Sequence, residues 1–146
     1  MKITTKTIYG LQALFEIALH GEVAEVSSAE IAREQKIPVK FLEQILLDLK
    51  RGGFVESRRG KIGGYLLAKH PSRIRLGEVI RYIDGAIEPI GCVDKHYKGC
   101  RDINRCVFRD VWAKVTESTS KIIDNITFED LAKKAKGSEK ALVYQI

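Results

Sequence analysis

Two short helical patterns joined by a tight turn, and then two strand-like segments around a glycine-rich turn, fill residues 27–68. Ser27 and Glu30 have the spacing of a capping box, in which each side chain bonds the other residue's backbone N–H, so a helix is predicted from here to about Gln35. After a tight turn, Pro38 is predicted at the first position of a second helix, where its missing N–H costs no intrahelical bond. This order of elements favours a helix-turn-helix with a hairpin wing.

The second predicted helix runs to about Lys50 and has two chemically distinct faces. Its apolar face, predicted to pack into the core, consists of Phe41, Leu42, Ile45, Leu46 and Leu49. The opposite face presents Val39, Lys40, Glu43, Gln44, Leu47 and Asp48. A polar face of this kind suits a DNA recognition helix, and it equally suits an ordinary helical hairpin with a solvated surface.

The hairpin predicted after this helix carries concentrated positive charge. Strands are predicted at 54–57 and 65–68, and the glycines between them permit positive φ and a close approach of the backbone to a surface. From Lys50 to Lys61 there are five cations and one acid, a net +4 out of the chain's +6. Such a patch is an electrostatic footprint for phosphate, and an arginine at a hairpin tip can enter a narrow minor groove. A nucleotide-phosphate loop is the alternative, but no Gly-Lys-Ser/Thr follows.

Helices are predicted on both sides of this stretch, which makes the fold class mainly α with a small β-hairpin wing. A first helix, ending near His20, is predicted to face the core with Ile8, Leu11, Phe15 and Ala18. A further helix is predicted from Leu76 to Ile83, ending at Asp84-Gly85. A long helix then carries the apolar stripe Phe108, Val111, Trp112, Val115, Thr119, Ile122 and Ile126. Thr127 and Asp130 are predicted to cap a short last helix that ends at Gly137.

The three cysteines lie together, as Cys92-x7-Cys100-x5-Cys106, between the helix predicted to end at Ile83 and the long helix. Thiolates in a reducing compartment bind zinc or iron–sulfur clusters, and this spacing admits both. Taken alone, the cysteines and His96 are the donors of a possible Cys3His zinc site. The odd cysteine count, the charges within the first twenty residues and the lack of a long apolar run predict a cytoplasmic protein with reduced thiols.

Three stretches together resemble the Rrf family of winged helix-turn-helix regulators. They are the opening M-K-I-T-T-K-T-I-Y-G-L, the run F-L-E-Q-I-L-L-D-L-K-R-G-G-F-V-E-S-R-R-G-K-I-G-G-Y-L-L-A, and the later L-G-E-V-I-R. The family includes the iron–sulfur cluster regulator IscR, to which the resemblance is greatest, the nitric-oxide sensor NsrR and the cysteine-metabolism regulator CymR. It implies a homodimer that reads a pseudo-palindromic operator in double-stranded DNA with a helix at about 39–50.

The resemblance also implies roles for single residues. The wing arginine of R-G-x2-G-G-Y falls on Arg59, which is expected in the minor groove, and the glutamate of aromatic-L-E-Q falls on Glu43, which can accept a hydrogen bond from cytosine N4. The other expected DNA contacts are Val39, Lys40, Gln44, Arg58 and Lys61. Three segments are implied: a DNA-binding domain at 1–85, a cluster-binding loop at 86–106, and a dimerisation helix with a cap helix at 107–146.

Sensing members of the family carry three cysteines in this place, so the resemblance favours a cluster over zinc, with 2Fe-2S first and 4Fe-4S second. The usual fourth ligand is missing. IscR-type proteins have a histidine where this chain has Arg109, and NsrR-type proteins have an aspartate where it has Ile8. His96 is the leading substitute, and Asp102, Asp110 or an external ligand are the alternatives.

The predicted function is therefore that of a transcriptional regulator, with repression of iron–sulfur cluster assembly genes as the expected direction and the cluster state setting operator affinity. A nitric-oxide or redox sensor and a cluster-free regulator of cysteine metabolism are the alternatives within the family. A small thiol enzyme is the alternative outside it, but the sequence contains no recognisable catalytic motif around its histidines, His20, His70 and His96. No enzyme activity is expected.

Overall fold

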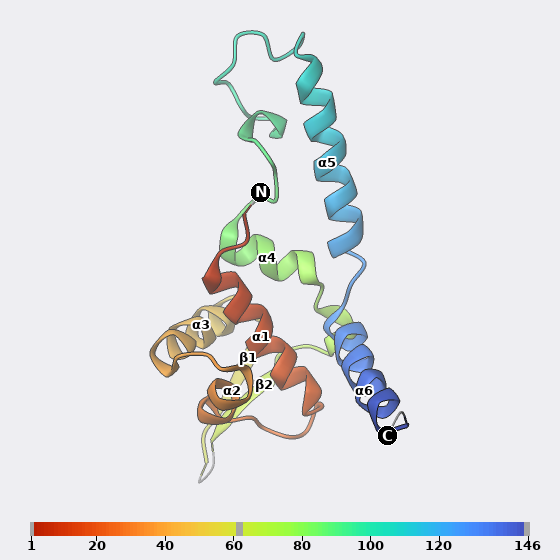
Figure 1. Ribbon diagram of the computed structural model, residues 1–146. Helices are drawn as coiled ribbons and strands as arrows, with labels where there is room; N and C mark the ends of the chain where they lie inside the picture. The colour runs from red at the N-terminus through yellow and green to blue at the C-terminus, as the bar shows by residue number, and fades with distance from the viewer. Residues whose placement is uncertain (1, 61–62, 145–146) are drawn as a thin grey trace.

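The computed structural model describes residues 2–60 and 63–144 of the chain. Its elements, in order, are α1 (Thr5–Leu19), α2 (Ser28–Gln35), α3 (Val39–Arg51), β1 (Val55–Arg58), β2 (Gly64–Leu67), the 3-10 turn η1 (Pro71–Arg73), α4 (Leu76–Asp84), the 3-10 turn η2 (Gly91–Val93), α5 (Val107–Ile123) and α6 (Phe128–Tyr144). Helices α1 to α4 and the hairpin form one body, from which α5 extends away (Figure 1). The mainly α fold with a hairpin wing is confirmed.

The helix-turn-helix forms where its capping residues predict it. The hydroxyl of Ser27 accepts a hydrogen bond from the Glu30 N–H at 3.1 Å, which starts α2, and Lys36 ends the helix with a left-handed φ of 54°. Pro38 caps α3 instead of occupying its first position as predicted. Its ψ of 129° is extended, and its carbonyl accepts the first intrahelical bond, from Leu42 N–H at 3.0 Å.

Helix α1 runs through the centre of the body, and its buried face agrees with the predicted one only in part: Ala18 is buried, and Leu11 and Phe15 pack against the core. Ile8 is 44% exposed, whereas Thr7, Gly10, Ala13, Leu14, Glu16, Ile17 and Ala18 are buried. Gly10 lies on this buried face, where a Cβ would lie 2.8 Å from Ile83 of α4. The lack of a side chain at Gly10 lets α1 lie close to α4 there. Phe41 of α3, also predicted in the core, is 62% exposed.

The hairpin is antiparallel, with Val55 opposite Leu67 and Arg58 opposite Gly64. Strand β1 begins one residue later than predicted, and β2 begins one residue earlier. A backbone pairing of Val26 with Tyr65 fixes it to the segment before α2. Gly64 is required there because a Cβ would lie 2.9 Å from the Val26 carbonyl oxygen. The wing is thus tied to the helix-turn-helix by main-chain bonds.

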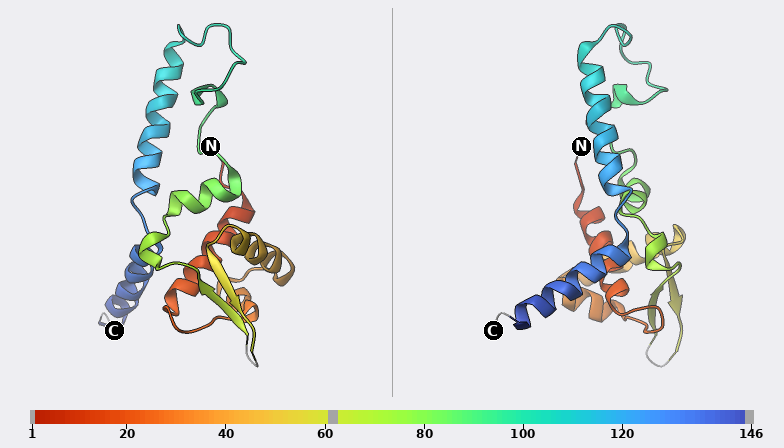
Figure 2. Two further views of the ribbon diagram at one scale, coloured as in Figure 1. Left: turned by 180° about the vertical axis from the view of Figure 1, so that it is seen from behind. Right: turned by 90° about the vertical axis from the view of Figure 1, so that its right-hand side faces the viewer.

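A compact joint connects α5 and α6 to the body. The Leu76 N–H donates to the Ile126 carbonyl at 2.9 Å, and the Phe128 N–H donates to the Ile74 carbonyl at 3.0 Å. Beside them the guanidinium of Arg81 in α4 donates to both carboxylate oxygens of Asp124, at 2.6 and 3.1 Å. Beyond this joint α5 buries none of its residues, and α5 and α6 leave it in different directions (Figure 2).

The last helix begins as predicted and ends later. Thr127 Oγ1 accepts from the Asp130 N–H at 3.1 Å, and Asp130 Oδ2 accepts from the Thr127 N–H at 3.0 Å. The helix continues through Gly137 to Tyr144, because a glycine costs an exposed helix only about 1 kcal/mol and does not end it. Within the described residues, no helix has both the length and the apolar character that a membrane crossing requires.

Candidate nucleic-acid interface and metal centre

The outward face of α3 is open to solvent, as predicted for the reading helix. Val39, Lys40, Glu43 and Gln44 are all exposed, while Leu42, Ile45, Leu46 and Leu49 on the other side are buried. The exposed ring of Phe41 lines an apolar hollow between α1 and α3, together with Thr5, Lys6, Tyr9, Gln44 and Ile45. The predicted polar contact residues therefore share one accessible surface.

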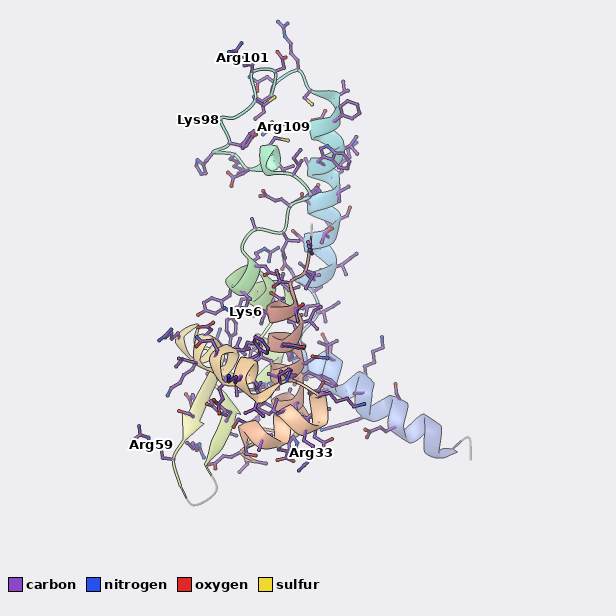
Figure 3. All side chains as sticks on the ribbon, turned by 60° about the vertical axis from the view of Figure 1, so that its left-hand side comes forward. Lys6, Arg33, Arg59, Lys98, Arg101 and Arg109 are labelled. Carbon is purple, nitrogen blue, oxygen red and sulfur yellow. The ribbon has the colours of Figure 1, made fainter. Side chains whose placement is uncertain are left out.

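The wing stands beside the C-terminal end of α3. Lys50 at that end donates to the Ser57 hydroxyl at 2.7 Å, which ties the helix to β1. Arg58 lies 3.7 Å from the carboxylate of Glu25, whereas Arg59 is exposed and points away from the body (Figure 3). Lys61, another predicted contact, lies outside the described residues. Of the two described wing arginines, Arg58 therefore has an acidic neighbour, and Arg59 points outward.

Sequence patterns did not predict the cluster of contacts around Asp48 on α3. The carboxylate pairs with Lys6 of α1 at 2.7 Å and accepts from the Gln44 amide at 3.3 Å, and Arg51 lies 3.8 Å away. The hydrogen bond from Lys6, reinforced by its positive charge, holds the pKa of Asp48 below its ordinary value. Only the helical spacings of Gln44 and Arg51 from Asp48, at i, i+4 and i, i+3, could have been found from the sequence.

Helix α4 also binds Asp48, at the main-chain carbonyl of that residue. The Tyr82 hydroxyl donates to the Asp48 carbonyl at 2.7 Å, and the Tyr82 ring meets Phe54 edge-on with centroids 5.3 Å apart. Gly52 makes room for this ring, because a Cβ there would lie 2.6 Å from it. The C-terminal half of the reading helix is therefore fixed by α1 on one side and α4 on the other.

The three cysteines lie on the segment that leads into α5. Cys92 is in η2, Cys100 is exposed in the loop, and Cys106 is the residue before α5; all three are free thiols. His96, the predicted fourth ligand, is exposed, and its backbone N–H donates to the Asp94 carboxylate at 2.7 Å. In the part of the chain that the structure describes, no group of three or more His, Cys, Asp or Glu side chains is close enough to hold a metal ion.

Arg109 connects the two ends of this cysteine segment. Its Nε donates to the main-chain carbonyl of Cys92 at 2.8 Å, so the first turn of α5 holds the turn that carries Cys92. Cys106 is three residues earlier on the same helix end. Lys98, Arg101 and Arg109 lie at this end of the molecule, opposite Arg59 on the wing (Figure 3). Three unpaired thiols that are at least partly accessible are a donor set that fits a thiolate-bound centre.

Comparison with protein families and curated sequences gives one consistent result. The Rrf2 model, described as an iron-dependent transcriptional regulator, matches residues 3–134. The HTH-type transcriptional regulator IscR of Yersinia pestis is 37% identical over 131 residues, which are 90% of this chain and 79% of that protein. IscR of Serratia proteamaculans is 36% identical over the same shares.

Solved structures of such regulators have the same fold. The structure of T. potens IscR has a TM-score of 0.77 and 34% identity, covering 94% of this chain and 90% of its own. CymR, the global cysteine regulator of B. subtilis, also has a TM-score of 0.77, with 30% identity and 92% and 98% coverage.

Proposed function

This chain belongs to the Rrf2 family of transcriptional regulators, and on that premise we propose that it senses an iron–sulfur cluster and reports its state through DNA affinity. It is an IscR-like, DNA-binding regulator with a winged helix-turn-helix, and its relatives are regulators and not enzymes. The observation that carries the sensing proposal is the set of three free thiols between the DNA-binding domain and α5.

For DNA reading, we propose that α3 enters the major groove and the wing follows the adjacent backbone and minor groove. Glu43 and Gln44 face base edges, and Val39 contributes an apolar contact. Lys40, Arg58 and Lys61 bind mainly phosphate, and Arg59 enters the minor groove. The exposure of the described residues in this set supports the assignment. We assign the DNA-binding domain to residues 1–85.

We propose a homodimer formed along α5, in the segment 107–146. This helix carries six large exposed apolar side chains, among them Phe108 at 65% and Ile122 at 63% exposure. Phe108, Val111, Trp112, Val115 and Ile122 follow helical spacing, so they lie on one stripe. A second copy of the stripe would cover this surface and would place two reading helices on the two halves of a pseudo-palindromic operator.

We propose that Cys92, Cys100 and Cys106 hold the cluster, within the segment 86–106. His96 is the leading fourth ligand, with Asp102, Asp110 or an external ligand as alternatives. A 2Fe-2S cluster is preferred, 4Fe-4S is second and zinc third. When bound, the group supplies a redox-sensitive centre whose potential a nitrogen or oxygen ligand raises. The protein's own contribution is the Arg109 hydrogen bond, which holds Cys92 close to the end of α5 that carries Cys106.

Cluster binding can affect DNA binding because the cysteine loop joins α4 of the DNA-binding domain to α5. A ligand shifts such an equilibrium only by its different affinities for the two states, so ordering of the loop must favour one placement of the reading helices. We expect the regulator to act in the cytoplasm and to repress cluster assembly genes. Regulation of cysteine metabolism without a cluster is the second candidate, favoured by the structural likeness to CymR.

Anaerobic Mössbauer or resonance Raman spectroscopy on the full chain would identify the centre. Operator titration with loaded and metal-stripped protein at one salt concentration would then test the coupling. We expect the two forms to differ in affinity or in operator preference. Equal affinity would contradict the sensing proposal, and stoichiometric zinc in colourless protein would contradict the cluster.

A further inference from the structure

The amide group of Gln44 has a defined orientation on the reading surface. Its nitrogen lies 3.3 Å from Asp48 Oδ1, one helical turn further along α3. An ionised carboxylate can only accept hydrogen bonds, so the Gln44 NH2 group, and not its carbonyl, must face Asp48. The Gln44 carbonyl oxygen is thereby left for other donors, and it has no partner among the described residues.

Asp48 is held in place from outside its own helix. Its Oδ2 pairs with Lys6 at 2.7 Å, and the Tyr82 hydroxyl binds its main-chain carbonyl at 2.7 Å. Arg51 lies 3.8 Å from Oδ1, on the same helix. Asp48 is ionised at neutral pH, and the hydrogen bond from Lys6 holds its pKa below the ordinary value. The acceptor that faces Gln44 is therefore fixed in both position and charge.

We propose that Asp48 contributes to sequence specificity by positioning Gln44 so that its carbonyl oxygen, with at most one N–H beside it, is presented to the major groove. This inference rests on the proposed use of α3 as the reading helix. In the major groove, the exocyclic amino groups at adenine N6 and cytosine N4 donate hydrogen bonds, while guanine and thymine present acceptors. Gln44 held in this way selects adenine or cytosine at one position of each half-site.

The isosteric change Asp48→Asn should reverse this choice. The Asn carbonyl will face Lys6, because that partner is charged and is closer than Gln44 or Arg51. The new amide NH2 then faces Gln44, which must turn its own carbonyl inward and present its NH2 group outward. A donor in that place prefers guanine or thymine. The change Asp48→Ala instead removes the acceptor that orients the Gln44 amide, so the preference between amine-bearing and carbonyl-bearing bases should weaken.

The experiment is selection of bound duplexes from a random DNA library by the full chain, followed by affinity measurements on sites that differ at one base pair. Gln44→Ala identifies the position that Gln44 reads. At that position we expect Asp48→Asn to change the affinity ratio between amine-bearing and carbonyl-bearing bases on the order of tenfold. Ratios are compared because loss of one negative charge raises affinity for every sequence alike. Thermal unfolding midpoints establish that each variant is folded.

Two results would overturn the inference, and they differ in what they imply. If the unaltered chain selects no sequence, the proposed reading function fails and the inference fails with it. If it selects an operator whose ranking changes in Gln44→Ala but not in Asp48→Asn or Asp48→Ala, reading by Gln44 stands and positioning by Asp48 is wrong. Asp48→Ala keeps the question decidable if the Asn variant does not fold.

Discussion

The guanidinium Nε of Arg109 donates a hydrogen bond to the main-chain carbonyl of Cys92, 2.8 Å away and 17 residues earlier in the chain. The resemblance to IscR-type regulators predicts a histidine at this position, and the chain has an arginine there instead. Here the side chain is directed to the protein backbone and holds the turn η2 against the start of α5. The position thus contributes to the shape of the cysteine segment.

Arg109→Ala is expected to leave the cluster less stable without preventing its assembly, because all three thiols remain and only the bond that holds Cys92 is lost. We expect the visible absorbance of anaerobically loaded protein to decay several-fold faster in air. Lys114→Ala, an exposed change on the same helix, is the control. Equal decay of all three proteins would show that Arg109 does not hold the site.

Replacement of Cys92, Cys100 or Cys106 by Ala should each abolish the colour of anaerobic protein, since a thiolate ligand is removed. Iron and sulfide analysis of the purified variants gives the measurement. His96→Ala tests the fourth ligand separately, and we expect a changed spectrum with part of the iron retained. A normal spectrum and lifetime would place that ligand elsewhere.

Arg59→Ala should weaken specific operator binding by about 1–3 kcal/mol, the worth of one good groove contact. Fluorescence anisotropy at fixed salt measures this loss. Arg73→Ala removes the same charge from an exposed residue outside the wing and should change affinity much less. Equal losses in the two variants would mean that Arg59 contributes only general electrostatic attraction.

Val111→Glu should convert the proposed dimer to monomers, because it puts a charge in the apolar stripe of α5. Ala113→Glu adds the same charge to the other side of the helix, where it is expected to leave the dimer intact. Sedimentation equilibrium measures the molecular mass of each variant. A dimer that persists in Val111→Glu would exclude α5 as the main interface.

Gly77→Ala should destabilise the joint between α4 and α5, because its new Cβ would collide with the Asp124 carboxylate that pairs with Arg81. A cost of about 1–3 kcal/mol is expected for such overpacking. Gly137→Ala is the matched control: a Cβ there meets open space within α6, so stability should rise by up to about 1 kcal/mol. Denaturant unfolding of both variants should give these opposite signs.

The sequence predicted the elements whose signals are local. Ser27 with Glu30 and Thr127 with Asp130 start their helices as expected, because a capping box needs only neighbours in the chain. The buried face of α1 was predicted only in part. Ala18 is buried as expected and Ile8 is exposed, because packing between distant segments, such as Gly10 against Ile83, sets which side of the helix faces the core.

The candidate site divides in the same way. The outward face of α3 follows from helical periodicity, and the structure leaves it exposed as expected. The contacts that fix it, from Lys6 and Tyr82 to Asp48, join α1 and α4 to α3 over long sequence distances. No local pattern encodes them. Phe41 was assigned to the core because it is apolar, although the fold leaves it at the rim of the hollow between α1 and α3.

If α5 tilts as a rigid rod about the joint at Arg81 and Asp124, a small rotation there is magnified along the helix. The helix has 17 residues, so at 1.5 Å per residue its far end lies about 25 Å from the pivot. A tilt of about 5° at the pivot therefore moves the cysteine end by about 2 Å. A displacement of atomic size among the thiols would then correspond to only a slight rotation at the joint. Two main-chain bonds, the Arg81–Asp124 ion pair, and hydrogen bonds from Arg75 to the Asp124 carbonyl and from Arg81 to Ser120 hold that joint.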